Sequence, residues 1–397
     1  MRFDVFFSIC QTPVDGYTPS DRKMFENFFS QAILADELGV GTAWVAETHL
    51  SCQVQKRNPG AVIPHFEGEI GLNTDILQIA HLLFAKTKKL HVGSAIRNIL
   101  CNGGPIAHAE AIRMFLALHG LDPREERLLD IGFASGRFPF SNVPYGIRPR
   151  NLLEKAAWGA LRGKLFQQAT EIFLRLLKGE VLASKDVAPI VLSRKDFRSD
   201  EDWATVQAAN LGADAAPVIE IPPFWFFDPV GLIPSETTLK LLRLTIGAHD
   251  LETQLFANRF LPVGVFNLSI TPGAQIEKTH EAMTKGFHKD GGPWTRNHMP
   301  RTVLVFHDPD PSKARAKAQK AMETYWKAIE GTLDPDKVKN AVDNALVGDS
   351  SEITAEAQRR FHKEDRLMLW FDFNNHDNED VCRSMRAFMN EVAPKLS

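Results

Sequence analysis

Short apolar segments alternate with segments of helical periodicity along most of this 397-residue chain, and this alternation restricts the possible folds more than any other feature. Residues 3–8 form a nearly continuous apolar run that predicts a buried strand. Apolar residues between 25 and 33 recur at helical spacing, and residues 42–46 form the next apolar run. The chain therefore opens with a βαβ unit, which indicates parallel strands covered by helices.

The same alternation continues to the end of the chain. It predicts further strands at residues 90–95, 128–132, 262–266, 302–306 and 367–373. It also predicts helices at residues 75–84, 105–119 and 152–177, a helix that begins near Ser235, helices after 272–273 and after 310–311, and a closing helix that ends at Pro394. Seven or eight strand–helix units without an internal sequence repeat favour an α/β fold of the (β/α)8 TIM-barrel type over an open sheet. At about residues 180–223 the periodicity weakens, which predicts an insertion within a single domain spanning 1–397.

The charge pattern indicates a small-molecule partner, with no nucleic acid and no membrane. The formal net charge is -3, and no block of Lys or Arg supplies the concentrated positive charge that those partners need. No apolar run approaches the roughly 20 residues of a membrane span. Four scattered cysteines are typical of a reducing compartment, so we expect a cytoplasmic protein. His49 and Cys52 lack a second ligand pair nearby, and no metal site is predicted.

In a barrel of this type, catalytic and binding groups come from the C-terminal ends of the strands and the following loops. After the second predicted strand, Glu47, Thr48 and His49 bring a carboxylate, a hydroxyl and an imidazole together. The third and fourth strand ends combine small residues, which admit a planar ligand, with hydrogen-bonding side chains and an arginine suited to a phosphate. These candidates are Ser94, Ala95, Asn98, Ser135, Gly136 and Arg137. Polar strand termini and ordinary turn glycines explain the same residues without any function.

Several stretches, taken in their order and spacing, resemble the bacterial luciferase-like monooxygenase superfamily. They are Ala-Asp-Glu-Leu-Gly at residues 35–39, Ala-Glu-Thr-His at 46–49, Leu-His-Val-Gly-Ser-Ala at 90–95, Pro-Ile-Ala-His-Ala-Glu at 105–110, residues 128–136, Val-Gly-Asp-Ser-Ser-Glu-Ile at 347–353 and Glu-Val-Ala-Pro at 391–394. No single motif is specific, but together they cover most of the chain outside about residues 180–300.

The resemblance implies a reduced flavin mononucleotide (FMN), supplied by a partner flavin reductase and held at the mouth of the barrel. With O2 the reduced flavin would oxygenate a small organic substrate, and Glu47, Thr48 and His49 would be the catalytic residues. His49 is expected to donate or accept a proton, and positioning of the flavin ring is the alternative role. The expected cofactor-binding residues are Phe6, the six candidates at the third and fourth strand ends, and Ser235 and Thr237. The last two are matched to a phosphate-binding helix start, although a plain N-cap explains them equally well.

The resemblance also implies a non-prolyl cis peptide at or beside Ala95–Ile96 and a homodimer formed through the early helices. Two positions depart from luciferase. Thr48 stands where luciferase has its first, catalytically important histidine, which argues against light emission. Ser135 replaces an arginine that luciferase uses for the flavin phosphate, and Arg137 is a candidate replacement. Two alternatives therefore stay open: a deazaflavin (coenzyme F420)-dependent hydride-transfer oxidoreductase, and a non-catalytic flavin-binding protein.

Overall fold

The computed structural model describes residues 1–57, 67–136, 139–210, 216–248, 250–329 and 344–396. Its main sheet contains nine strands in the order β10-β9-β11-β1-β2-β3-β4-β7-β8, and all of its strand pairs are parallel. The strands are β1 (Arg2–Phe7), β2 (Thr42–Val45), β3 (His91–Asn98), β4 (Leu129–Ala134), β7 (Leu242–Ile246), β8 (Val263–Val265), β9 (Arg301–His307), β10 (Leu346–Gly348) and β11 (Arg366–Trp370).

The row of strands curls until β8 meets β9. The amide of Asn267, just beyond β8, donates to the carbonyl of Pro300 at 2.9 Å, and the amide of Thr302 in β9 donates to the carbonyl of Asn267 at 2.9 Å. These bonds join the strands into a ring, while β10 pairs with the far end of β9 and stays outside the ring. The fold is therefore TIM-barrel-like, as predicted from the alternation of elements.

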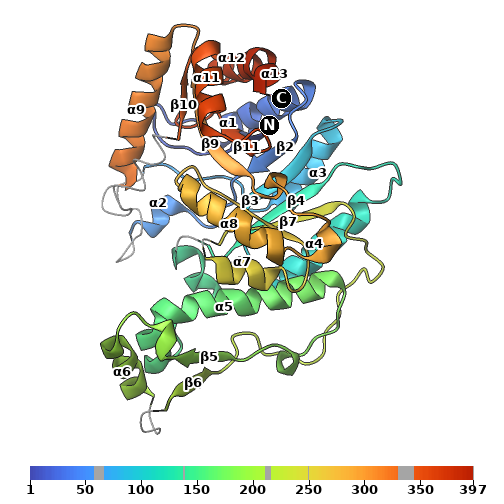
Figure 1. Cartoon of the computed structure of the whole chain (residues 1–397), viewed down its shortest axis with the longest axis vertical. Helices are drawn as coiled ribbons and strands as arrows, with labels where there is room; N and C mark the ends of the chain where they lie inside the picture. The colour runs from blue at the N-terminus through green and yellow to red at the C-terminus, as the bar shows by residue number, and fades with distance from the viewer. Residues whose placement is uncertain (58–66, 137–138, 211–215, 249, 330–343, 397) are drawn as a thin grey trace.

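Helices cover the outside of the ring (Figure 1). They are α1 (Asp21–Glu37), α2 (Cys52–Gln55), α3 (Ile76–Lys86), α4 (Gly104–His119), α5 (Leu152–Lys178), α7 (Leu251–Ala257), α8 (Gly273–Gly286), α9 (Pro311–Ile329), α11 (Ser350–Arg360), α12 (Asn378–Ala387) and α13 (Ala393–Leu396). Side-chain caps begin several of them; Ser20 accepts from the amide of Lys23 at the start of α1, and Asp75 begins α3. Within the described ranges, no helix has the length and apolar character needed to cross a membrane.

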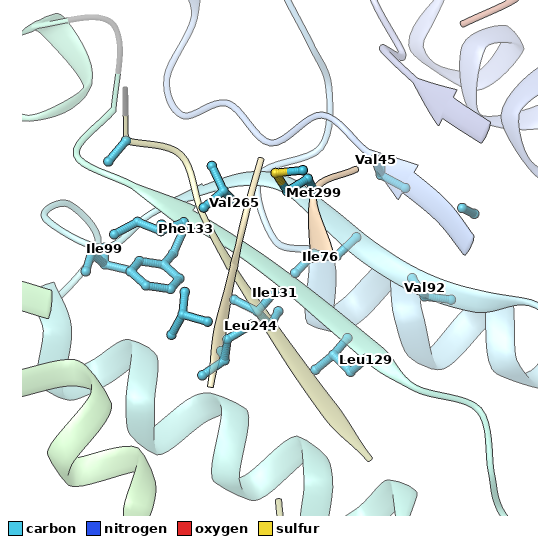
Figure 2. Packing of buried hydrophobic residues seen from close by; sticks show 14 of the residues in the cluster. Val45, Ile76, Val92, Ile99, Leu129, Ile131, Phe133, Leu244, Val265 and Met299 are labelled. Carbon is cyan, nitrogen blue, oxygen red and sulfur yellow. The ribbon is translucent and has the colours of Figure 1, made fainter. Parts of the chain in front are cut away.

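Apolar side chains fill the space between the ring and its helices (Figure 2). Leu129, Ile131 and Phe133 of β4 are fully buried, and they occupy alternate positions on one face of the strand. Because successive strand side chains point to opposite faces, Asp130 points the other way. It reaches side chains of β2, β7 and β11 across the inside of the ring. β4 therefore separates an apolar outer layer from a polar barrel interior.

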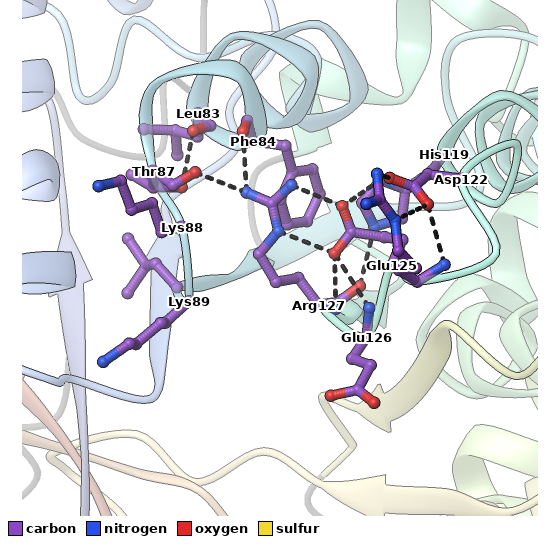
Figure 3. A network of polar contacts seen from close by, with 12 residues as sticks. Leu83, Phe84, Thr87, Lys88, Lys89, His119, Asp122, Glu125, Glu126 and Arg127 are labelled. Carbon is purple, nitrogen blue, oxygen red and sulfur yellow. Dashed lines mark hydrogen bonds and ion pairs between the residues drawn. The ribbon is translucent and has the colours of Figure 1, made fainter.

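A polar cluster ties the C-terminal end of α3 to the segment that enters β4 (Figure 3). Arg127 donates to the backbone oxygens of Phe84 and Thr87 at 2.8 Å each, and it pairs with Glu125 at 2.5 Å. The hydrogen bond from Arg127 lowers the pKa of Glu125 to about 2. Because this cluster lies at the N-terminal end of β4, it anchors the helix layer at the end of the barrel opposite the strand C-termini.

A two-stranded antiparallel unit lies beyond α5 (Figure 1). It consists of β5 (Ile190–Ser193) and β6 (Val218–Ile221), with α6 (Asp200–Ala209) between them in sequence. This unit falls within the stretch where the periodicity weakens. That the stretch is an insertion relative to other barrels stays a prediction.

Parts of the second half differ from the sequence-based expectations. No helix begins near Ser235, where the chain forms turns, and β7 begins at Leu242 instead. We missed β7 because Arg243 interrupts its apolar pattern; the structure pairs this arginine with Asp130 inside the ring. The last helical stretch does not end at Pro394. It passes through a π-helical turn at Phe388–Val392 into α13, where Pro394 lies in the first turn and needs no amide hydrogen.

Candidate functional site

A cavity of about 490 Å³ opens at the C-terminal ends of the barrel strands, and we call it the mouth cavity. Its size falls within the roughly 300–1,000 Å³ typical of small-molecule sites. The predicted residues that line it are Phe6, Glu47, Thr48, His49, Ala95, Asn98, Ser135 and Gly136. A larger groove of about 750 Å³ lies between α1 and α12 on the outer helix layer, remote from these strand ends.

The backbone around the mouth adopts unusual conformations. Ile9, Leu50 and Asn374 follow β1, β2 and β11, and their φ angles are 47°, 65° and 49°. Positive φ is rare for residues other than glycine, and for a β-branched residue such as isoleucine it is a genuine outlier. Such conformations persist where the surrounding structure enforces them, often at functional sites. The strand ends that form the cavity are therefore locally strained.

Glu47 is the buried acid of the mouth cavity. One carboxylate oxygen, Oε2, accepts a hydrogen bond from Ser94 Oγ at 3.0 Å, and Oε1 lies 3.2 Å from Arg97 Nη1. Burial alone disfavours the charged carboxylate, but Arg97, together with His49 and Ser94, outweighs burial and lowers the pKa of Glu47. Glu47 therefore stands as a fixed negative charge beside the cavity.

Arg97 is itself held from three directions. Its Nη1 also contacts Asp75 Oδ1 at 3.1 Å, and its Nε donates to His108 Nδ1 at 2.8 Å. His108 Nε2 lies 3.0 Å from the backbone oxygen of Cys101. Burial and the neighbouring Arg97 lower the pKa of His108 to about 4, so this imidazole is neutral and can accept from Arg97. The guanidinium therefore has one fixed orientation toward Glu47.

His49 lies between Glu47 and the open part of the cavity. Its side chain is 6% exposed, and its Nε2 is 3.6 Å from Glu47 Oε1, beyond hydrogen-bonding distance. This nitrogen is buried and has no hydrogen-bond partner among the described residues. A buried polar atom without a partner is rare and calls for an explanation, such as a bound ligand or a catalytic role. Thr48 differs, because its hydroxyl donates to the backbone oxygen of Gly71 at 2.9 Å.

The third strand brings this network together through an irregular backbone. A cis peptide joins Ala95 and Ile96, at the position that the resemblance implied. The pairing register between β3 and β4 shifts between Ser94 and Arg97. Ser94 and Arg97 both reach Glu47, while Ala95 and Ile96 between them line the cavity. One irregular segment thus provides a small apolar surface and the two donors that fix the acid.

The opposite wall carries a second acid. Asp372 lies just beyond β11, and its Oδ2 accepts from the backbone and side chain of Ser8 at 3.3 Å each. Its Oδ1 is buried without a hydrogen-bond partner in the described part of the chain. Burial raises the pKa of Asp372 to about 6, against the lowering effect of the bonds from Ser8. Ser8 lines the cavity, so this acid lies directly behind the cavity wall.

A second cavity of about 570 Å³ adjoins the mouth cavity. Three small residues, Ser135, Gly136 and Gly247, line both of them within the described part of the chain. Gly136 has φ +75°, and a Cβ there would stand 2.3 Å from Asn98 Nδ2. The second cavity also carries the exposed arginines Arg148 and Arg162. The two cavities are therefore neighbours; Glu47 and Glu69 line the first, while Arg148, Arg162 and Asp250 line the second.

The structure brings most, but not all, of the predicted site residues together. Ser94 touches Glu47 but does not line the cavity. Arg137 lies outside the described residues. Ser235 and Thr237 line neither cavity; the carbonyl of Ser235 accepts from Arg113 at 2.8 Å, and Thr237 Oγ1 donates to the backbone oxygen of Pro234 at 3.0 Å. The helix N-terminus that these two residues were expected to begin is absent, so that reason for assigning them a phosphate is wrong.

Sequence reasoning missed several residues of the site. They are Cys10, Thr12, Arg97, His108, Arg148, Arg162, Tyr325, Trp370, Phe373 and Asn374. Arg97 was detectable, because it is a charged residue at the end of an apolar strand, where burial requires a partner. The residues beyond β11 carried the same positional signal as those beyond β2. Arg148 and Arg162 carried none, since isolated surface arginines are common.

No protein-family model and no curated protein sequence matches the chain. Solved structures do match it over its whole length. The monooxygenase RslO1 from Streptomyces bottropensis superposes over 100% of both chains with a TM-score of 0.69 at 19% identity. The oxygenating constituent of 3,6-diketocamphane monooxygenase from Pseudomonas putida, solved with FMN, matches 100% of this chain and 98% of its own with a TM-score of 0.58 at 14% identity.

An F420-dependent secondary alcohol dehydrogenase, solved with an F420-acetone adduct, matches 100% of this chain and 99% of its own, with a TM-score of 0.59 at 14% identity. At such low identity these likenesses establish the fold. The shared fold agrees with the resemblance to the luciferase-like superfamily. One of these structures was solved with FMN and another with an F420 adduct. The cofactor and reaction of this chain follow only from its own site.

Proposed function

We propose that this protein is a flavin-dependent monooxygenase that uses reduced FMN and O2 to oxygenate a small organic substrate. The observation that carries the proposal is the unpartnered Nε2 of His49, buried beside a fixed carboxylate in the cavity at the barrel mouth. Perturbed and unsatisfied groups that meet in a concave site at this end of a barrel indicate catalysis. The structural neighbours solved with FMN or F420 add support at the level of the fold.

The residues present fit a flavin. Ala95, Ile96, Gly136 and Gly247 provide a surface of small and apolar groups at the strand ends, where a planar ring can approach the backbone. Because the two cavities share lining residues, a ring in the mouth cavity would direct its phosphate toward the second cavity. In this arrangement Ala95 would contact the ring.

Arg148 and Arg162 are the residues that we propose for the phosphate. Neither side chain has a salt bridge or hydrogen bond to another described residue, and both line the second cavity. Arginine offers several donors in a planar fork that matches phosphate oxygens. This assignment replaces Ser235 and Thr237, which lie elsewhere.

The protein residues would bind, orient and move protons. When bound, a reduced flavin supplies two electrons to O2, so that one oxygen atom enters the substrate and the other leaves as water. His49 would hold or donate a proton toward the reacting groups, Glu47 would stabilise the protonated imidazole, and Arg97 would keep Glu47 ionised and oriented. Thr48, whose hydroxyl is already engaged, would only shape the cavity. The apolar walls would exclude water from the reaction.

Two partners belong to the proposal. A flavin reductase would supply the reduced cofactor. A second copy of the chain would cover an apolar surface on the early helices, where Leu82 of α3 and Met114 and Leu118 of α4 are 51%, 47% and 45% exposed. Contiguous exposed apolar residues often mark an interface. Light scattering should give a dimer, and Leu118→Lys should convert it to a monomer.

The first experiment compares anaerobic binding of reduced FMN, reduced riboflavin and reduced F420. We expect FMN to bind about tenfold or more tightly than riboflavin, because charge-assisted bonds to the phosphate contribute about 1.5–3 kcal/mol. Arg148→Gln combined with Arg162→Gln should remove that difference. Arg124→Gln is the matched control, since this exposed arginine pairs only with Asp122.

Each outcome selects one function. Binding of F420 alone would favour the hydride-transfer enzyme, which a similarly folded dehydrogenase represents. Tight binding of FMN without any oxygen consumption would favour the non-catalytic flavin-binding protein. Binding of neither cofactor would refute the flavin proposal altogether.

A further inference from the structure

Four aromatic side chains form a continuous wall along one side of the mouth cavity, and we call them the aromatic wall. Phe6 and Trp370 have ring centroids 4.5 Å apart, Trp370 and Phe373 4.8 Å apart, and Phe373 and Tyr325 5.3 Å apart. All four line the cavity. They come from β1, from β11 and the residues after it, and from α9. The aromatic wall therefore extends from the barrel strands β1 and β11 to helix α9 of the outer layer.

The described lining of the mouth cavity disfavours an anionic substrate. Among the described residues that line it there is no lysine or arginine. The two glutamates there are already engaged: Glu47 by Arg97, and Glu69 by Ser51 Oγ at 2.5 Å and the amide of Cys52 at 2.7 Å. A carboxylate, sulfonate or phosphate would meet these negative charges without a partner of its own, at a large desolvation cost. The described part of the cavity therefore favours a substrate that is uncharged at this end.

A polar group at the end of the aromatic wall has spare hydrogen-bonding capacity. The hydroxyl of Tyr325 makes no hydrogen bond to any residue that the structure describes, although the side chain is only partly exposed. A phenol oxygen can both donate and accept. Tyrosine in such a position offers an apolar ring with a polar tip. A hydroxyl or carbonyl group on the ligand would satisfy it.

We propose that the substrate of this site is an uncharged planar aromatic compound bearing at least one hydroxyl or carbonyl group, bound against the aromatic wall. The inference deepens the monooxygenase function and rests on it for the reaction, but binding of the ring compound does not depend on the cofactor. Aromatic rings prefer offset or edge-to-face contact with other rings, which adds affinity beyond the burial of apolar area. A saturated chain would gain only the burial of apolar area, and a ring without a hydroxyl or carbonyl group would leave the Tyr325 hydroxyl unpaired.

The test uses four probes of similar size with the full-length protein: 1-naphthol, naphthalene, 1-naphthoate and octan-1-ol. Isothermal titration should show that 1-naphthol binds about tenfold more tightly than octan-1-ol. 1-Naphthoate should bind more weakly than octan-1-ol. Naphthalene, which lacks the hydroxyl, should bind more weakly than 1-naphthol.

Variants assign the binding to the wall. Phe373→Leu keeps apolar volume, so it should weaken 1-naphthol about fivefold and leave octan-1-ol unchanged. Tyr325→Phe should remove the preference for 1-naphthol over naphthalene. Phe226→Leu is the matched control, because Phe226 is 86% exposed and lies outside the cavity. A thermal melt of each variant checks that the fold is intact.

Titration of reduced FMN into the same preparations separates the two proposals. If FMN binds but octan-1-ol or 1-naphthoate binds as tightly as 1-naphthol, the substrate class is wrong and the flavin function stands. An unchanged 1-naphthol affinity in Phe373→Leu would likewise overturn the aromatic wall as its site. If reduced FMN does not bind while 1-naphthol does, the substrate class stands and the monooxygenase function fails.

Discussion

Two buried polar networks lie inside the same ring of strands, and they differ in how completely their groups are paired. The first, which we call the base network, lies toward the N-terminal ends of the strands. Asp4 accepts from the Thr42 amide at 3.0 Å and pairs with Arg366 at 2.6 Å. Asp130 pairs with Arg243 at 2.6 Å and accepts from Thr42 Oγ1 at 3.1 Å. Two carboxylates therefore balance two guanidiniums, and none of these side chains has an unsatisfied buried atom.

The second, the mouth network, is incomplete. Glu47 and Asp75 provide two carboxylates, but Arg97 is the one guanidinium that the structure places with them. Among the described residues, His49 Nε2 has no hydrogen-bond partner, and neither does Asp372 Oδ1 on the opposite wall. One negative charge thus stays unbalanced unless a proton or a ligand joins the site.

The comparison separates groups that hold the barrel together from groups that are ready to react. Burial of an unpaired polar group costs stability, so a fold retains one only where something offsets the cost. In the base network each of the two carboxylates and two guanidiniums is paired within the chain. At the mouth the missing partners are those that a cofactor, a substrate or a moving proton would supply.

Disrupting the base network should have the largest effect on stability. Asp130→Asn keeps the size of the side chain but removes the charge that faces Arg243 and Arg366. Breaking a buried ion pair from one side costs about 3–5 kcal/mol, because it leaves the other charge uncompensated. Urea denaturation should show a loss of that size in the free energy of unfolding. Cofactor binding by the remaining folded protein should be unchanged.

The pH dependence gives an internal control. Burial opposes ionisation of Asp130, but Arg243 and Arg366 outweigh it and lower its pKa. A depressed pKa contributes stability that is present above the ordinary aspartate value of about 3.9 and is lost as the pH falls through the folded value. The gap between the natural protein and Asp130→Asn should therefore shrink in acid. A gap of under about 1 kcal/mol at neutral pH would show that the base network is not structural.

Replacing His49 should have the opposite effect to Asp130→Asn: the free energy of unfolding should barely change, and oxygen consumption should fall. His49→Gln should change the free energy of unfolding by less than about 1 kcal/mol, since the side chain has no hydrogen bond to lose. The rate at which protein loaded with reduced FMN consumes oxygen should fall about 100-fold, because a positioned proton carrier contributes at least that much. His362→Gln on the surface is the control. Equal loss of rate in both variants would remove His49 from the mechanism.

Much of this comparison was predictable from the sequence. Strand and helix periodicity gave the barrel, because apolar patterning reflects burial in each element. The position of Glu47 and His49 after the second strand gave part of the mouth, because barrel sites gather at strand ends. The partners of Glu47 did not follow from the sequence. Arg97 belongs to the same strand as Ser94, but an irregular backbone turns both toward Glu47, and periodicity contains no sign of that irregularity.

The base network and the phosphate site were hidden for a different reason. Arg243 and Asp130 are 113 residues apart in sequence, and they meet only because β4 pairs with β7, which sets the two residues side by side. Charged residues inside predicted strands weakened the apolar pattern, so β7 was missed. The cluster beginning at Ser235 suggested a helix start, yet local propensity was overridden there by the turns that lead into β7. Sequence patterns describe local elements well and long-range pairing poorly.

The smallest predicted effect concerns Asp372 and shows whether its unpaired oxygen is costly. Burial raises the pKa of Asp372 to about 6. Because the folded state then holds the proton more tightly than the unfolded chain, stability falls as the pH rises from about 4 to about 6. Asp372→Asn mimics the neutral acid. It should be more stable than the natural protein by about 1–2 kcal/mol near pH 8, allowing for partial exposure, and equally stable near pH 4.

Urea denaturation at both pH values measures this difference, and Asp228→Asn on the surface is the control. If Asp372→Asn gives no gain near pH 8, the ionised carboxylate must have a donor in solution that satisfies Oδ1. The neighbouring indole N–H of Trp370, which is also buried without a partner, is the nearest candidate on that wall. A small rotation would then pair the two groups, and the mouth would differ from the base only at His49.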